Sequence, residues 1–258
     1  MMCNFRTKKK RGMSEGAVLS TGDTGAGECR IFRVGEPADD EVCVLCIGDS
    51  LTRGFQGTYA LPARPYAAAL SQLLGPGFAL DERGVDGDMS AGITARGTAA
   101  LRAMAQRGRR YGACIVEGGA NDCFADALRF VPGETPAAHL RPLLDACLCH
   151  VAADGAARLV LVTAHVLEAR GTDVDAHRRR LNAWLRAYAA EPGHAGRVVL
   201  VDAEHAYPQC DTAEGRASGL WAPDNVHLTA RGYDALAEAV YRAVQGLAPW
   251  SQGASRAL

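Results

Sequence analysis

The chain has no marked excess of charge of either sign. Its 258 residues include 28 basic and 29 acidic side chains, which leaves a formal net charge of −1 at pH 7. Proteins whose main partner is nucleic acid or an anionic membrane surface carry a basic surplus, so we expect neither partner. Lysine is almost absent: the three lysines stand together at positions 8–10, and arginine supplies every other basic side chain.

Long apolar stretches are also missing. No run of about 18 apolar residues occurs, so we expect no transmembrane helix. No apolar stretch follows the basic run Lys8–Arg11, which excludes a secretory signal peptide. The cysteines number nine, an odd count that does not suggest a disulfide framework. Free thiols and a reducing, cytoplasmic location are therefore expected.

One cysteine pair has the spacing of a zinc half-site, Cys43-Val44-Leu45-Cys46. It falls inside a short apolar run, and no second Cys or His pair follows at zinc-finger spacing. Thiols packed as small apolar side chains are the favoured interpretation. We expect no metal site and no cofactor.

The chain divides at about residue 41. Residues 1–40, rich in Gly, Ser and Thr, are expected to form a flexible tail, with a targeting signal in the Lys8–Arg11 run as the alternative. Residues 41–247 are expected to form one domain, followed by a C-terminal tail at 248–258. The oligomeric state is left open.

Short β-rich runs alternate with helical patterns throughout this domain. The expected strands are 42–47, 78–80, 114–117, 159–163 and 198–202, and the expected helices are 65–74, 94–106, 137–153, 175–190 and 230–244. Such alternation predicts an α/β fold, in which helices cover both faces of a five-stranded parallel sheet in three layers.

Polar residues stand at the ends of these strands, where open parallel sheets bind their ligands. Ser50 follows the first strand, Gly87 the second and Asn121 the third, while Asp224 and His227 precede the last helix. A serine hydroxyl needs a neutral imidazole to take its proton, and a carboxylate to orient that imidazole. A backbone N–H in a glycine turn and an asparagine amide can both stabilise an oxyanion. These are the parts of a serine acyl-transfer site.

Four motifs contain these residues in order. They are Val44-Leu45-Cys46-Ile47-Gly48-Asp49-Ser50-Leu51-Thr52, Gly84-Val85-Asp86-Gly87-Asp88, Gly119-Ala120-Asn121-Asp122 and Asp224-Asn225-Val226-His227-Leu228-Thr229. Together they resemble the sequence blocks of the GDSL, or SGNH, hydrolase family. Glu82 stands where the second block usually has asparagine.

This resemblance implies a flavodoxin-like α/β/α sandwich and a serine esterase. Ser50 would be the nucleophile, His227 the base and Asp224 its acid, with oxyanion donors from the Ser50 and Gly87 N–H groups and the Asn121 side chain. The substrate would be a small-molecule carboxylic ester. Relatives also include thioesterases, lysophospholipases and carbohydrate deacetylases, which stay open as alternatives.

Several neighbouring residues have simpler interpretations. Asp49 and Asp122 are expected to be structural, and Asp86 and Asp88 to be loop acids that face solvent. His165, which no acid precedes by three residues, is expected at the polar rim of the site and not as its base.

Two other classes of function remain. Nucleotide or flavin binding needs a glycine-rich phosphate loop after the first strand, and residues 48–54 lack one. A non-catalytic binding module on the same fold is the other class. The sequence 12–16 fits Gly-x-Ser-x-Gly, but the basic run before it cannot be the buried strand that such a serine requires.

The acyl group is expected to be short. Large apolar side chains near the site are scattered, among them Phe55, Tyr59 and Met89, and residues 168–173 and Arg178–Arg180 form a polar stretch that we expect to be solvated. A long chain would need a continuous apolar lining.

Overall fold

The computed structural model describes residues 19–21, 29–35, 41–129, 136–151, 156 and 158–250. Its strands are β1 (Leu19–Thr21), β2 (Cys29–Arg33), β3 (Val42–Gly48), β4 (Phe78–Gly84), β5 (Ala113–Glu117), β6 (Leu159–Val162) and β7 (Val198–Val201). Its helices are α1 (Ser50–Arg53), α2 (Tyr66–Leu74), α3 (Ser90–Gln106), α4 (Ala120–Arg129), α5 (Pro136–His150), α6 (Asp173–Ala189), α7 (Ala203–Ala206), α8 (Ala213–Ser218) and α9 (Ala230–Val244), with a 3₁₀ turn at Pro192–His194.

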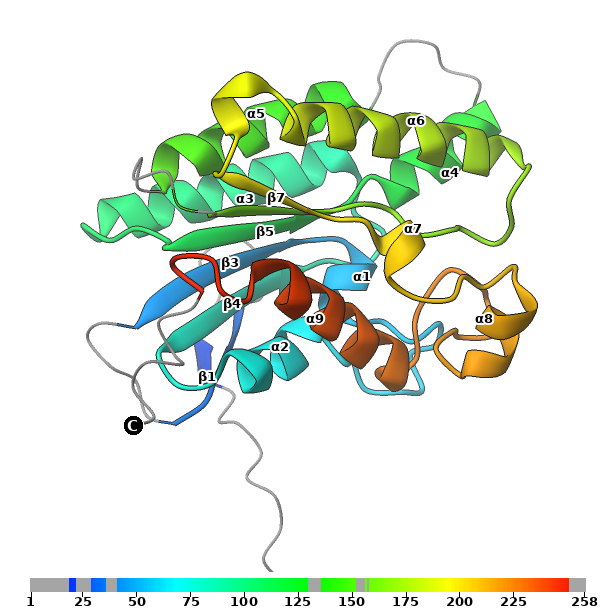
Figure 1. The fold of residues 1–258 in the computed structure, drawn as a ribbon, viewed down its shortest axis with the longest axis horizontal. Coiled ribbons are helices and arrows are strands. Elements are labelled where there is room, and N and C mark those ends of the chain that lie inside the picture. Colours follow the sequence, from blue (N-terminus) through cyan, green and yellow to red (C-terminus); the bar gives the residue numbers. More distant parts are fainter. Residues whose placement is uncertain are drawn as a thin grey trace, which may run out of the picture.

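The described strands form one sheet in the order β1-β2-β4-β3-β5-β6-β7. The strands from β3 to β7 are parallel to one another, and β2 pairs antiparallel with β4 and with β1 at the edge of the sheet. Helices lie on both faces of the sheet (Figure 1). The predicted three-layer α/β fold with five parallel strands is therefore confirmed, and two antiparallel strands are added to it.

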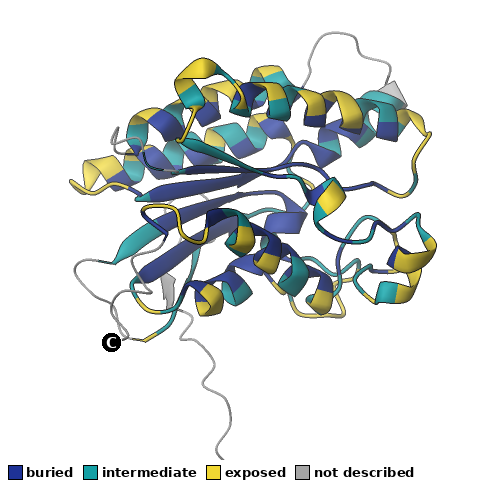
Figure 2. Ribbon diagram, in the orientation of Figure 1, coloured by how far each residue is buried: buried dark blue, intermediate teal, exposed yellow. Residues whose placement is uncertain are grey.

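The central strands are buried between the two helix layers (Figure 2), and apolar side chains on both faces of the sheet form the core. On one face α3, α5 and α6 pack their leucines, such as Leu101, Leu143 and Leu181, against the strands. On the other face α2 and α9 contribute Leu70 and Val240. Burial on both faces explains why the central strands are almost continuously apolar. No described helix has the length and apolar character to cross a membrane.

The two cysteines with zinc-like spacing lie within β3. Side chains alternate along a strand, so Cys43 packs on one face of the sheet and Cys46 on the other. Burial raises the pKa of Cys43 to about 12, which keeps its thiol protonated. The pair therefore cannot share one metal ion. The described residues contain no cluster of three or more His, Cys, Asp or Glu suited to a metal.

The expected tail is wrong for residues 29–33. They form β2, which pairs antiparallel with β4. Arg30 Nε lies 2.6 Å from Glu82 Oε2, and Cys29 Sγ donates to Asp81. These partners donate to buried acids of β4, which runs on through its charged residues to Gly84, beyond the expected end at Leu80. The rest of residues 1–40, apart from 19–21 and 34–35, lies outside the described residues, including the Lys8–Arg11 run and the 12–16 motif.

The domain also continues past residue 247. Trp250, which we assigned to a C-terminal tail, is only 3% exposed and stacks on Phe78 with ring centroids 6.2 Å apart. This apolar contact, on the face of the sheet that α2 and α9 cover, holds Trp250 against the domain. Residues 251–258 lie outside the described part.

Candidate active site

Ser50 is placed at the carboxyl edge of the sheet by a sharp turn from strand to helix. β3 ends at Gly48, and Ser50 opens the short helix α1. Asp49 caps that helix, because its carboxylate accepts from Leu51 N at 2.9 Å. The Ser50 side chain thus lies at a helix N-terminus, where backbone N–H groups stabilise negative charge.

The acid and the base come from the loop before α9. His227 Nε2 lies 2.9 Å from Ser50 Oγ, and His227 Nδ1 lies 2.7 Å from Asp224 Oδ2. The other oxygen of Asp224 accepts from the N–H groups of Val226 and His227 at 3.0 and 2.9 Å. Burial alone would raise the pKa of Asp224, but these hydrogen bonds hold it below its ordinary value, so the carboxylate is charged. The structure therefore brings Ser50, His227 and Asp224 into one hydrogen-bonded chain.

Aromatic side chains pack against the imidazole ring of His227. The Phe55 ring meets His227 edge-on, with centroids 4.8 Å apart, and Tyr59 lies against Phe55 at 4.8 Å. Tyr233 in α9 donates to the Phe55 carbonyl at 2.6 Å. These contacts tie the segment after α1 to the helix that follows the base.

Gly87 occupies the loop between β4 and α3, with φ +72°, a backbone conformation that favours glycine. An arginine holds the acid on each side of it. Arg53 Nη1 lies 2.6 Å from Asp86 Oδ2, and Arg96 binds the carboxylate of Asp88. The expectation that these two acids face solvent is therefore wrong.

Arg96 was missed by sequence reasoning. Besides Asp88, it donates to the carbonyl oxygens of Arg83 at 2.6 Å and Gly48 at 2.9 Å. It thus ties the ends of β3 and β4 to the Gly87 loop. The only signal in the sequence was an arginine eight residues after an acid, which is too common to stand out.

Asn121 lies in the first turn of α4, a helix that the sequence did not predict because the glycines before it suggest only a turn. Its amide nitrogen donates to the Asp88 carbonyl at 2.8 Å and lies 3.4 Å from Asp49 Oδ2. The second contact is long for a hydrogen bond, so it is the weaker of the two that the amide makes. The neighbouring Asp122 accepts from Ser90 N at 2.8 Å and joins α4 to α3, as its expected structural role requires.

Two buried carboxyl groups, those of Asp49 and Glu117, lie close to the nucleophile. Glu117 ends β5 and accepts from Thr52 Oγ1 at 3.2 Å. Burial and the nearby Asp49 carboxylate raise the pKa of Glu117 well above its ordinary value. Burial also raises the pKa of Asp49, to about 6. Sequence reasoning missed Glu117, which had looked like an ordinary strand end.

His165 is not at the rim of the site. Its side chain is buried, with Nε2 2.8 Å from the Val226 carbonyl and Nδ1 3.1 Å from the Tyr207 hydroxyl. Both ring nitrogens are engaged, so His165 has no free nitrogen to act as a base. Burial lowers its pKa to about 4, which keeps the ring neutral.

Comparison with known proteins agrees with this geometry. Residues 46–235 match the model of the GDSL-like lipase/acylhydrolase family, well over half of the chain. The chain belongs to this family. As a GDSL hydrolase it acts on ester bonds. No match is found among curated proteins.

Solved structures share the GDSL fold. A lipase/acylhydrolase from Enterococcus faecalis aligns with a TM-score of 0.58 and 16% identity, over 81% of this chain and 98% of that one. A catalytic mutant of an acetylxylan esterase from Geobacillus stearothermophilus gives 0.56 and 19%, over 79% and 94%. A family 3 carbohydrate esterase from Clostridium thermocellum gives 0.55 and 16%, over 79% and 95%. At these identities the likeness is one of fold.

Proposed function

We propose that this GDSL hydrolase cleaves carboxylic esters through an acyl-enzyme on Ser50. The observation that carries the proposal is the hydrogen-bonded chain from Ser50 through His227 to Asp224, which joins residues 177 positions apart. A non-catalytic binding module has no need for such a chain. The fold alone would not decide between the two.

Each step uses a group in this site. Ser50 Oγ attacks the ester carbonyl carbon while His227 Nε2 takes the hydroxyl proton, and the charged Asp224 stabilises the resulting imidazolium. The oxyanion binds the N–H groups of Ser50 and Gly87 and the Asn121 amide. His227 then gives its proton to the departing alcohol. A water molecule, deprotonated by His227, attacks the acyl-enzyme, releases the carboxylic acid and restores Ser50.

We further propose a small ester with a short acyl group as the substrate. Exposed large apolar side chains stand on two separate loops, with Tyr59 78% and Leu61 51% exposed after α1 and Met89 38% exposed before α3. Two structural neighbours act, by name, on carbohydrate esters. A carbohydrate deacetylase on the same site is therefore the second candidate, ahead of a thioesterase or lysophospholipase with a long acyl chain.

Labelling with a fluorophosphonate, which reacts with activated serine hydroxyls, tests the proposed nucleophile. The wild type should be labelled and hydrolyse p-nitrophenyl acetate, and Ser50→Ala should lose the label and about 10⁴-fold or more of kcat. Ser71→Ala, which removes a buried serine hydroxyl on α2, is the matched control and should keep both. Hydrolysis by Ser50→Ala at the wild-type rate would refute the proposal.

A further inference from the structure

The loop that carries the acid and the base meets the segment after β6 at a strained contact. Among the described residues, only Glu168 and Asn225 combine a side chain with a positive φ, 60° and 53°. A hydrogen bond joins them, from Glu168 N to the Asn225 carbonyl at 3.0 Å. Such conformations persist only where the surroundings hold them, and they cluster at functional sites.

His165 makes the second hydrogen bond across this contact. Its Nε2 lies 2.8 Å from the carbonyl oxygen of Val226, the residue directly before the base. A carbonyl can only accept, so Nε2 carries the hydrogen and Nδ1 accepts from the Tyr207 hydroxyl at 3.1 Å. Trp221 meets the ring of His165 edge-on, with centroids 4.8 Å apart. The imidazole is thereby fixed in both tautomer and orientation.

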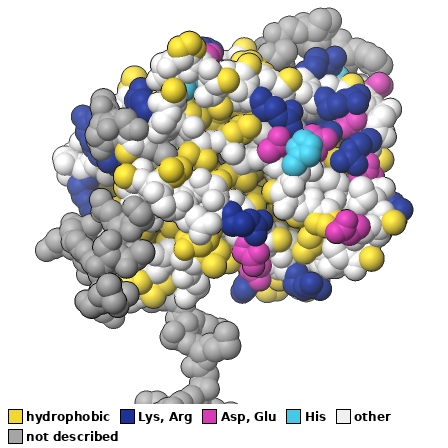
Figure 3. Space-filling view, in the orientation of Figure 1, with side chains coloured by type: hydrophobic (Ala, Val, Ile, Leu, Met, Phe, Trp, Pro, Cys, Tyr) yellow, Lys and Arg dark blue, Asp and Glu magenta, His cyan; other side chains and the backbone are white. Residues whose placement is uncertain are grey.

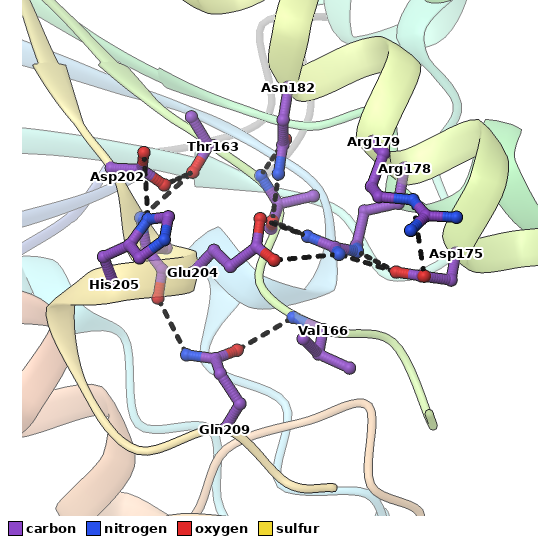
Figure 4. Close-up of polar contacts among 12 residues, drawn as sticks. Thr163, Val166, Asp175, Arg178, Arg179, Asn182, Asp202, Glu204, His205 and Gln209 are labelled. Carbon is purple, nitrogen blue, oxygen red and sulfur yellow. Dashed lines mark hydrogen bonds and ion pairs between the residues drawn. The ribbon is translucent and has the colours of Figure 1, made fainter. Parts of the chain in front are cut away.

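The backbone on each side of His165 is held by buried side chains (Figure 4). Asn182 in α6 donates to the Ala164 carbonyl at 2.7 Å and accepts from Ala164 N at 3.0 Å. Gln209 accepts from Val166 N at 2.9 Å. His165 therefore projects from a segment whose position α6 and the residues after α7 determine.

A buried charge network reinforces this segment. Arg178, whose side chain is 0% exposed, pairs with Asp175 at 2.6 Å and Glu204 at 2.9 Å and donates to the Ala164 carbonyl at 3.4 Å. On the outer surface arginine and acidic side chains lie side by side near α7 (Figure 3). Because its side chain is fully buried, Arg178 belongs to the interior, and the expectation that it lies in a solvated stretch is wrong.

We propose that His165 is a positioning residue, which holds the Asp224–His227 pair in its working geometry through the Val226 carbonyl. The inference rests on the proposed esterase function. Asp224 and His227 lie on an irregular loop, with side chains 34% and 17% exposed, so their geometry depends on what supports the backbone between them. His165 reaches that backbone 61 residues away in the sequence.

A neutral ring suits this role. Burial is the main cause that lowers the pKa of His165 to about 4; the nearby His227 and Arg178 act in the same direction, and the Val226 hydrogen bond and Asp224 oppose it. The Tyr207 hydroxyl is the other titratable group that faces the ring. The Nε2–H donor is therefore present, and uncharged beside the base, over the whole range in which an unprotonated His227 can act.

The test compares His165→Leu, which removes the donor, with His165→Gln, whose amide can replace it. Because small displacements of reacting groups are costly, His165→Leu should lower kcat by about 10- to 100-fold with KM nearly unchanged. The acid limb of its pH–rate profile should move to lower pH, since a displaced Asp224 stabilises the protonated base less. His165→Gln should recover most of both properties.

Tyr188→Phe is the matched control, because it removes a part-buried hydrogen bond of α6, 2.8 Å to Asp145, without touching the catalytic loop. It should lower the melting temperature and leave kcat and the pH profile unchanged. Should His165→Leu fail to fold, Tyr207→Phe replaces it: loss of the hydroxyl removes one of the two hydrogen bonds that orient the ring, and it should lower kcat by about threefold or more.

The outcomes separate this inference from the proposed function. A wild type that neither labels at Ser50 nor hydrolyses esters would defeat the proposed function. An active wild type beside a folded His165→Leu, or a Tyr207→Phe in its place, with unchanged kcat and pH profile would overturn the positioning role alone.

Discussion

Asn121 illustrates how one side chain can serve both structure and chemistry. One amide hydrogen is committed to the Asp88 carbonyl in the Gly87 loop, at 2.8 Å. The other makes only a long contact with Asp49 Oδ2, at 3.4 Å, and in the proposed mechanism it donates to the oxyanion. The hydrogen bond to Asp88 therefore orients the Asn121 amide and links it to the loop whose Gly87 N–H is another proposed oxyanion donor.

Replacing this amide should affect the transition state more than substrate binding. Asn121→Ala removes a donor used when the oxyanion forms, so we expect kcat to fall by roughly 10²–10³-fold with little change in KM. Steady-state kinetics with p-nitrophenyl acetate measures both constants. A large rise in KM with kcat preserved would contradict the assignment.

His165 also makes stability depend on pH. In the unfolded chain its pKa is near 6.5, and in the folded protein burial lowers it to about 4. Below pH 6.5 the unfolded state binds a proton that the native state does not. The stability from the neutral ring is therefore complete above pH 6.5 and is lost as the pH falls toward 4.

The variant His165→Gln, which cannot titrate, should remove this component. Its free energy of unfolding in urea should decrease less than that of the wild type between pH 7 and pH 4.5. His205→Gln, at a histidine whose side chain is 73% exposed, is the matched control and should follow the wild type. If the free energy of unfolding decreased equally in the wild type and in His165→Gln, the ring would not titrate as its burial indicates.

At the scale of elements, β2 makes residues 29–33 part of the domain. Arg30 pairs with Glu82, whose side chain is 1% exposed, and donates to the Arg53 carbonyl at the end of α1. Burial raises the pKa of Glu82 even with this arginine beside it. Deletion of residues 1–38, which a flexible tail would tolerate, would remove this partner of Glu82.

Arg30→Ala should therefore destabilise the protein by about 1–3 kcal/mol, because it leaves a buried acceptor without its donor. Thermal or urea unfolding measures the change. Arg64→Ala is the matched control: its pair with Asp234 spans 3.6 Å between half-exposed side chains, and such surface pairs contribute little. Equal effects of the two substitutions would mean that β2 does not anchor the buried acid.

At the scale of the whole molecule, the proposed preference for a short acyl group follows from the side chains exposed on the loops around the site. Each buried methylene contributes about 0.8 kcal/mol only where an apolar wall receives it. Tyr59 and Met89 stand on separate loops, and Arg178 does not contribute to the surface at all.

A series of p-nitrophenyl esters should therefore show a maximum at short chains. We expect acetyl to hexanoyl esters to be cleaved with higher kcat/KM than decanoyl or palmitoyl esters. Values that rise steadily to twelve carbons and beyond would contradict this and indicate an apolar groove for lipid chains.

Local patterns in the sequence determined much of this protein. Continuous apolar runs predicted the five parallel strands, because a strand buried on both faces cannot carry solvated side chains. Strand ends then located Ser50, Gly87 and Asn121 at one edge, because parallel strands place their carboxyl ends together. The Asp224–His227 pair could be predicted because its two members are three residues apart.

Only the tertiary structure decided which charged and polar side chains are buried. Arg30 meets Glu82 across 52 positions, and His165 meets Val226 across 61. A buried charge or imidazole is tolerated when a partner satisfies it, and that partner comes from a distant element that no local pattern reveals. For the same reason β2, the arginines around Gly87 and the support of the catalytic loop emerged only once the chain was folded.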